Sequence, residues 1–77
     1  MKRIEIAAIR KAEDAEIRVA VTEYKGRPVL DIRVWYLPRD KRPGSEWFPT
    51  RKGVTFDLEK LPDMTAALVE AERLMRD

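Results

Sequence analysis

The sequence predicts an α+β domain in which a four-stranded antiparallel meander sheet precedes one C-terminal helix. Three observations support this fold: apolar residues alternate with polar ones over most of the chain, a tight-turn signal at Lys25-Gly26 joins two such segments, and the period changes to helical spacing near the end. Strands followed by a helix are typical of the α+β class. The 77 residues suffice for one domain, so we expect residues 1–77 to form a single unit, with the sheet at about 3–58 and the helix at about 62–76.

Four segments are predicted to be strands, because apolar residues recur in them at every second position or fill them. In the second, Ile17, Val19 and Val21 point to one face while Arg18 and its even-numbered neighbours point to the other. The third segment is apolar on both faces, which is typical of a strand covered on both sides. The predicted strands are residues 3–10, 15–24, 28–37 and 52–58.

The connections carry turn residues. We expect Glu13-Asp14 in the first turn and a two-residue hairpin at Lys25-Gly26, where Gly26 supplies a positive φ. A longer, basic loop is predicted from Pro38 to Ser45, and Asp57 is expected to cap a short turn before the helix.

The helix is predicted from an apolar stripe that includes Met64, Leu68 and Ala71. Pro62 suits its first turn. Together with the third strand, this stripe offers more apolar surface than one thin sheet can cover, so we expect helix and central strand to pack against a second copy of the chain in a homodimer.

Composition excludes several classes of function. The chain has no Cys and no His, so disulfides, thiolate zinc sites, His-ligated metals and Ser-His or Cys-His nucleophiles are absent. No metal-ligand spacing or phosphate-binding glycine pattern is present, and we predict neither enzyme activity nor a cofactor. Without a signal peptide or a transmembrane segment, we expect a cytoplasmic protein with no membrane partner, associated with the nucleoid if bacterial.

The charged and aromatic residues are unevenly distributed. Residues 25–52 hold eight basic and three acidic side chains, a net charge of +5, although the whole chain is only +2. Five of the six aromatic residues lie within positions 24–48. Cations neutralise phosphates and rings stack on unpaired bases, so this segment predicts a site for single-stranded nucleic acid. The alternative is that the rings are core residues and the cations a solvated face.

Two stretches resemble the signatures of the transcriptional positive cofactor 4 family, a family of single-stranded DNA-binding coactivator domains. The first, from Glu23 to Tyr36, contains Lys-Gly-Arg, a short apolar run, Asp-Ile-Arg and paired aromatics. The second, from Glu46 to Phe56, contains a Pro closely followed by Arg-Lys-Gly and a strand. The resemblance covers residues 15–76, and without a Ser- and Lys-rich tail the chain is most similar to stand-alone bacterial members.

The resemblance implies a curved sheet and a homodimer that binds single-stranded DNA with little sequence specificity, in transcription, replication or repair. It also implies transcription machinery as a partner. The contacts carried over by motif position, with two further rings from the aromatic pattern, are Tyr24, Lys25, Arg27, Arg33, Trp35, Tyr36, Trp47, Arg51 and Lys52.

The sequence departs from the family pattern in places. The aromatic pair reads Trp35-Tyr36 in place of Tyr-Trp, which leaves open which ring faces the bases, although the family register favours Tyr36. Phe48 stands where the family has Lys, and the loop over 37–46 is longer than usual. We also expect Asp31 and Arg33 to share a strand face, where a structural ion pair is the alternative to DNA contact.

Two other functions fit the same residues. A single-stranded RNA-binding protein would use the same basic and aromatic groups, since recognition of the 2′-hydroxyl depends on geometry. A protein–protein adaptor would use the basic face to dock an acidic partner.

Overall fold

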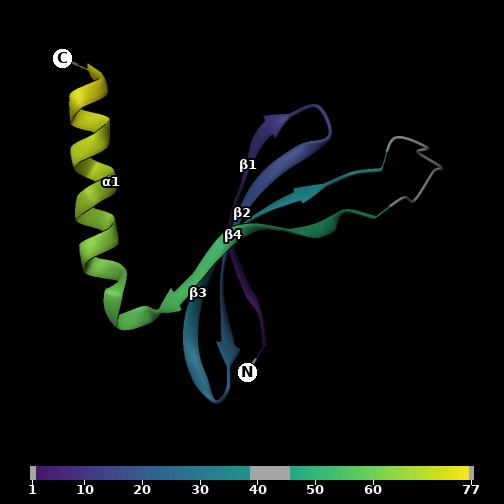
Figure 1. Cartoon of the computed structure of the whole chain (residues 1–77), viewed down its shortest axis with the longest axis horizontal. Helices are drawn as coiled ribbons and strands as arrows, with labels where there is room; N and C mark the ends of the chain where they lie inside the picture. The colour runs from purple at the N-terminus through teal and green to yellow at the C-terminus, as the bar shows by residue number, and fades with distance from the viewer. Residues whose placement is uncertain (1, 39–45, 77) are drawn as a thin grey trace.

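The computed structural model describes residues 2–38 and 46–76. They form four strands, a short 3₁₀ helix and one long α-helix in that order along the chain (Figure 1). The strands pair in the order β1-β2-β3-β4, and every pairing is antiparallel. The prediction of a meander sheet followed by a C-terminal helix is therefore confirmed. The bounds are β1 Ile4–Ala12, β2 Ala15–Tyr24, β3 Arg27–Tyr36, β4 Phe48–Asp57, η1 Leu58–Lys60 and α1 Leu61–Arg76.

The hairpin between β2 and β3 has the predicted geometry. Lys25 and Gly26 are the two turn residues, both with positive φ (51° and 80°), and Tyr24 pairs with Arg27 across them. Two consecutive positive φ values are those of a type I′ turn, whose twist matches that of the flanking strands. The basic loop predicted from Pro38 to Ser45 lies largely outside the described residues.

The fourth strand begins earlier than predicted. It starts at Phe48, whereas the sequence pattern placed its start at residue 52. The alternation is broken there because Pro49 and an irregularity in the pairing interrupt the period of two. β4 is an edge strand, where the missing N–H of a proline is tolerated.

The turn after β4 also differs in detail from the prediction. Asp57 occupies the position before η1, but its side chain makes no capping hydrogen bond. It forms an ion pair with Arg27 instead, with 3.4 Å between the charged atoms. The helix bounds agree with the prediction to one residue.

The two faces of the sheet differ in chemistry because side chains alternate along each strand and directly paired residues point the same way. Arg18 pairs with Arg33 and Ala20 with Asp31, which defines a polar face. Val19 pairs with Ile32, which in turn pairs with Val54, and these define an apolar face. We use these two names below. The further apolar-face residues on the central strands are Ile17, Val21, Leu30, Val34 and Phe56.

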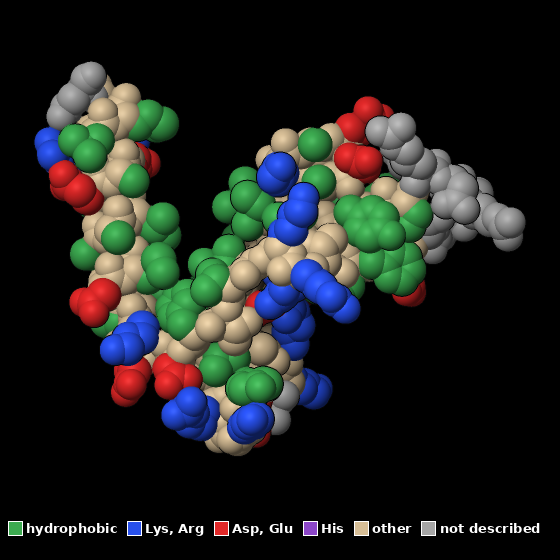
Figure 2. Space-filling view, in the orientation of Figure 1, with side chains coloured by type: hydrophobic (Ala, Val, Ile, Leu, Met, Phe, Trp, Pro, Cys, Tyr) green, Lys and Arg blue, Asp and Glu red, His purple; other side chains and the backbone are tan. Residues whose placement is uncertain are grey.

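The core of the described chain is small. Only Ala20, Val29, Leu30 and Asp31 are buried among the described residues. The helix stands away from the sheet, and Figure 2 shows hydrophobic side chains both on the helix and along the part of the sheet turned toward it, with open space between. The exposed fractions of Leu68 and Leu74 are 59% and 60%. Within one copy of the chain, the helix stripe is largely exposed and the apolar face is only partly covered, since Leu30 is buried but Val54 is 48% exposed.

No helix in the described part of the chain is long and apolar enough to cross a membrane.

Candidate nucleic-acid interface

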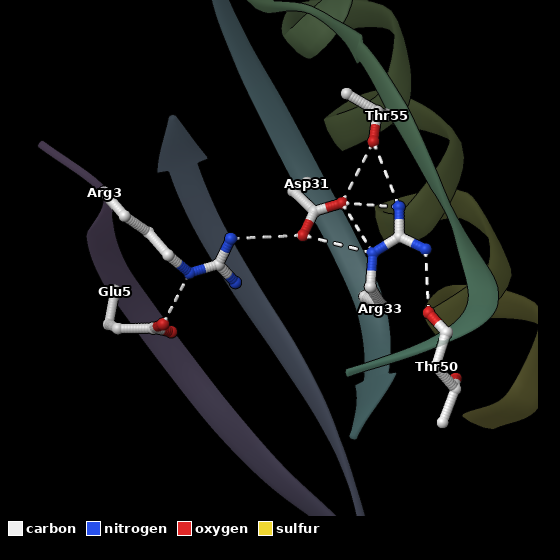
Figure 3. Close-up of polar contacts among 6 residues, drawn as sticks. All are labelled: Arg3, Glu5, Asp31, Arg33, Thr50 and Thr55. Carbon is white, nitrogen blue, oxygen red and sulfur yellow. Dashed lines mark hydrogen bonds and ion pairs between the residues drawn. The ribbon is translucent and has the colours of Figure 1, made fainter. Parts of the chain in front are cut away.

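A buried carboxylate organises the polar face. Asp31 is 5% exposed and lies at the centre of β3. It accepts hydrogen bonds from Arg33 Nη2 at 2.9 Å, from Thr55 Oγ1 at 3.0 Å and from Arg3 Nη1 at 3.3 Å (Figure 3). The ion pair between Asp31 and Arg33, which the sequence left open as the alternative to DNA contact, is present.

Burial and pairing act on Asp31 in opposite directions. Burial raises the pKa of its carboxyl, because the charged form loses water. The hydrogen bonds from Arg33 and Thr55 and the nearby positive charges outweigh this, so the net pKa of Asp31 lies below its ordinary value. The carboxylate is therefore charged at neutral pH and links β3 to β4 and to Arg3, the residue before β1.

Most of the hydrogen-bond donors of Arg33 serve this network. Its Nε and Nη2 groups bind Asp31, Nη2 also donates to Thr55, and Nη1 donates to the carbonyl oxygen of Thr50 at 3.0 Å. A guanidinium has five N–H donors, so at most one remains. The side chain is 24% exposed, which leaves it little surface for a ligand.

Both tryptophans lie under arginines on the polar face. Arg18 is 4.3 Å from the centre of the Trp35 ring and 5.7 Å from that of Trp47. Arg3 is 5.5 Å from the Trp35 ring, and Arg10 is 5.8 Å from the Trp47 ring. These distances fit cation–π contacts. We call Arg3, Arg10, Arg18, Trp35 and Trp47 the arginine–tryptophan cluster.

The three arginines of this cluster were not among the predicted site residues. Arg18 could have been found from the hairpin register, since counting back from the two-residue turn places it opposite Arg33 and diagonal to Trp35. Arg3 and Arg10 could not have been found in this way, because the pairing of β1 with β2 contains two register shifts that the alternation of residues does not reveal.

The remaining predicted residues are exposed and fall into two groups. The first is the hairpin tip, with Tyr24, Lys25 and Arg27. Tyr24 is 58% exposed, and the centre of its ring lies 5.4 Å from the Lys25 ammonium nitrogen. Arg27 is 69% exposed and its ion pair with Asp57 is a surface one, a kind that contributes about 0–1 kcal/mol.

The second group, at the other end of β3, consists of Tyr36, Arg51 and Lys52. Phe48, which was not among the predicted contacts, pairs with Tyr36, and we call these four residues the β4 patch. Tyr36 is 45% and Phe48 47% exposed, and their ring centres are 6.3 Å apart. Arg51 and Lys52 are exposed, and neither has a hydrogen bond or an ion pair from its side chain to any other described residue. These cations are available to an external anion.

The structure thus does not bring all nine predicted residues together. Trp35 and Tyr36 point to opposite faces, as expected for neighbours in a strand. Trp35 belongs to the polar face and is half-buried, whereas Tyr36 is exposed at the edge of the apolar face. The hairpin tip and the β4 patch are separated by the length of β3, roughly 30 Å at the usual rise per residue.

Metal chemistry finds no support in the described part of the chain, where no group of three or more acidic side chains is placed to hold a metal ion. Asp31 and Asp57 are each paired with arginine.

Comparisons with known proteins agree on one family. The sequence pattern of the family described as Transcriptional Coactivator p15 (PC4) matches residues 11–67. No curated protein matches the chain. Among solved structures, the chain is similar to BPSL1147, a PC4 homologue from Burkholderia pseudomallei, in an orthorhombic crystal form, with 30% identity, a TM-score of 0.77, and coverage of 90% of this chain and 88% of that one.

A second, tetragonal crystal form of the same Burkholderia protein gives 28% identity and a TM-score of 0.77, with 92% and 98% of the two chains covered. A bacteriophage T5 homologue of the eukaryotic coactivator, implicated in recombination-dependent DNA replication, gives 26% identity and a TM-score of 0.74. That alignment covers 99% of this chain and 83% of the phage protein.

Proposed function

The chain belongs to the Transcriptional Coactivator p15 (PC4) family, and from this premise we propose that it binds single-stranded DNA with little sequence specificity. The family is a non-catalytic, DNA-binding one, which agrees with the prediction that the chain is not an enzyme. We assign the protein to transcription, replication or repair. The phage T5 homologue, implicated in recombination-dependent DNA replication, supports the second of these processes.

The observation that carries the proposal is the pairing of exposed rings with uncommitted cations. In the β4 patch, the exposed rings of Tyr36 and Phe48 lie at the start of β4, and Arg51 and Lys52 follow three and four residues after Phe48 along the same strand. The charges of Arg51 and Lys52 are not neutralised by any described residue. The hairpin tip repeats the combination with Tyr24 and Lys25. Exposed rings accept bases by stacking, and free cations accept phosphates.

By the same reasoning, the buried members of the predicted set serve the fold. Trp35 and Trp47 are covered by arginines, and Arg33 has at most one free donor. We therefore assign DNA contact to the exposed residues Tyr24, Lys25, Arg27, Tyr36, Phe48, Arg51 and Lys52.

We further propose that the active form is a homodimer. The helix stripe and the apolar face both belong to this chain, and neither is fully covered within it. A second copy supplies one helix and one sheet of matching chemistry, so that the two uncovered surfaces bury each other. The dimer joins two sets of contacts, and one DNA strand that engages both gains from effective concentration.

The test is a titration of the full chain with oligo-dT, followed by intrinsic fluorescence and by the anisotropy of a labelled strand. If about five phosphates are neutralised, the slope of log K against log salt is about −3.5, and affinity falls roughly a hundredfold between 50 and 200 mM salt. Duplex DNA should bind weakly. A flat salt response, or tighter binding to duplex than to oligo-dT, contradicts the proposal.

Two further ligands separate the alternatives. Oligo-rU of the same length tests the RNA-binding alternative, which predicts tighter binding to the ribose strand. Polyglutamate tests the adaptor alternative, which predicts that an acidic chain without bases binds as well as oligo-dT and that no ring fluorescence is quenched on binding.

A further inference from the structure

The pairing of β4 with β3 is irregular at the β4 patch. Arg33 pairs with Gly53 and Trp35 with Pro49, so two steps along β3 correspond to four along β4. Residues 50–52 therefore lie opposite Val34 alone. Extra residues of this kind form a bulge, a feature that re-aims side chains at sheet edges.

Side-chain hydrogen bonds hold this bulge. The hydroxyl of Thr50 donates to the carbonyl oxygen of Val34 at 2.7 Å and accepts from the backbone N–H of Lys52 at 3.1 Å. Arg33 Nη1 donates to the carbonyl oxygen of Thr50 at 3.0 Å. The bulge is thus tied to β3 through Thr50, which also holds the backbone of Lys52.

Gly53 closes the bulge on its far side. A Cβ at this position would lie 2.5 Å from the carbonyl oxygen of Ile32 and 2.9 Å from the Cα of Arg33. Both are backbone atoms, so the strands approach more closely here than any other residue permits. The chain returns to regular pairing at Gly53, directly after Lys52.

Arg33 is itself held in place from the other side. Its Nε and Nη2 atoms bind Asp31, which is buried, so the guanidinium links the Asp31 network to the bulge (Figure 3). Four of the five N–H donors of Arg33 are occupied in this way, so only one is left to bind a phosphate directly.

We infer that Arg33 and Thr50 are positioning residues, which hold the bulge and thereby present Arg51 and Lys52 to DNA phosphates. The inference rests on the proposed function. In a regular strand the two consecutive side chains would point to opposite faces, and the bulge removes that constraint. A held bulge also lowers the ordering cost that a loose segment would incur on binding.

The experiment compares three variants by oligo-dT binding over a range of salt. Arg51→Gln with Lys52→Gln removes two phosphate contacts, which lowers the salt slope by about 1.4 and the affinity about 25-fold at 0.1 M salt. Thr50→Val removes only a hydroxyl, and Arg33→Lys keeps its charge. Both should nevertheless lower the slope by about 0.7 to 1.4 and the affinity about five- to 25-fold.

Combined variants separate positioning from direct contact. Added to the Arg51→Gln, Lys52→Gln protein, Thr50→Val and Arg33→Lys should each change affinity less than twofold, because nothing is left to position. If Arg33→Lys instead lowers the affinity of the double-glutamine protein by the same factor as it lowers that of the wild type, Arg33 itself contacts DNA. Thr55→Val is the matched control, since it removes a hydroxyl from the Asp31 network but no bond to residues 50–52, and it should keep the wild-type slope.

The failures are distinguishable. If the glutamine double variant weakens binding while Thr50→Val leaves the slope unchanged, the positioning role is overturned and the proposed function stands. If oligo-dT does not bind the wild type, the proposed function fails first. Thr50→Val keeps the test decisive if Arg33→Lys does not fold, because its substituted side chain has the same shape and suits a strand.

Discussion

The two faces of the sheet are built from the same strands but are completed in different ways. On the polar face, Asp31 is surrounded by partners from β3, β4 and the residue before β1, and both tryptophans lie under arginines. On the apolar face, Ile32 is half-buried and Val54 is 48% exposed, and α1 stands away from the sheet (Figure 2). The polar face finds most of its partners within its own chain, although Arg3 Nη2 and Trp35 Nε1 are buried without a hydrogen-bond partner among the described residues. The apolar face is the one that the proposed second copy would cover.

This difference shows why residue type alone is a poor guide to a binding site. Arginine and tryptophan are the residues one would choose for binding nucleic acid, yet here both tryptophans and three of the arginines contact each other. The exposed rings and cations lie at the two ends of β3. The hairpin tip is distinguished by its exposure, and the β4 patch by its exposure together with two cations that have no partner among the described residues.

The largest expected effect comes from breaking the apolar side. Leu68→Glu places a charge in the middle of the helix stripe, where the proposed second copy would bury it, and an unpaired buried charge is strongly destabilising. We expect an unfolded or weakly binding monomer. Sedimentation of the wild type should give about twice the 9.0 kDa chain mass, with a melting temperature that rises with protein concentration.

The control for that variant lies on the opposite side of the same helix. Ala66 is exposed and about half a turn away from the stripe, so Ala66→Glu should keep the dimer and the wild-type melting temperature. A folded 9 kDa wild-type monomer that binds oligo-dT tightly would show that neither the helix nor the apolar face needs a partner.

The next largest effect concerns the free cations. Reversing both charges with Arg51→Glu and Lys52→Glu should lower affinity by more than about 25-fold at 0.1 M salt, equally for all base sequences, and flatten the salt slope. The fold should stay intact, because neither side chain has a partner among the described residues. Circular dichroism and anisotropy titrations measure the two properties separately.

A matched variant tests whether position or net charge is responsible. Lys11→Glu with Lys60→Glu changes the net charge by the same amount at exposed sites outside both proposed contact groups. It should lower affinity much less than the patch variant does. Equal losses would mean that binding follows overall charge and that the β4 patch has no special role.

A smaller expected effect on DNA affinity distinguishes the roles of the neighbouring rings of Trp35 and Tyr36. Tyr36→Leu should weaken binding by about 1–3 kcal/mol if one base stacks on the exposed ring. Trp35→Phe should leave binding nearly unchanged and lower the free energy of unfolding instead, because the indole lies beneath Arg18 and Arg3. The reverse result would place the bases on the polar face.

The sequence predicted the order of elements because alternation and helical spacing are local signals. It predicted the Lys25-Gly26 hairpin for the same reason, and the turn then fixes the register of β2 against β3. It could not predict the start of β4, because the bulge at residues 50–52 depends on hydrogen bonds from Arg33 and to Val34, which are distant in sequence.

The sequence predicted which types of residue form the candidate site, but it did not predict which of them are exposed or where they lie relative to one another. All nine predicted residues were chosen by type and motif, and the structure divides them into exposed and committed groups. Burial and partner choice depend on which strands pair, and the pairing of β1 with β2, which includes two register shifts, accompanies contacts of Arg3 and Arg10 with rings more than 20 positions away. No periodicity within β1 indicates those contacts.

The smallest effect is the acid sensitivity of the polar face. The pKa of Asp31 is lower in the folded protein than its ordinary value near 3.9, because the hydrogen bonds from Arg33 and Thr55 outweigh burial. A carboxyl with a depressed pKa stabilises the fold fully above its unfolded-state pKa and loses that contribution as pH falls through its folded-state value. Asp31→Asn keeps the shape but has no charge to lose.

The stability difference between wild type and Asp31→Asn should therefore be constant from about pH 8 to about pH 5 and shrink below about pH 4. Denaturant unfolding at one fixed protein concentration measures it, since the proposed dimer makes stability depend on concentration. A difference that stays constant down to pH 2, or that grows on acidification, would mean that the network does not depend on the charge of Asp31. The polar face would then be stabilised by side-chain packing and by hydrogen bonds that do not require a charged carboxylate. In that case the two faces would differ in how their side chains pack and not in their dependence on charge.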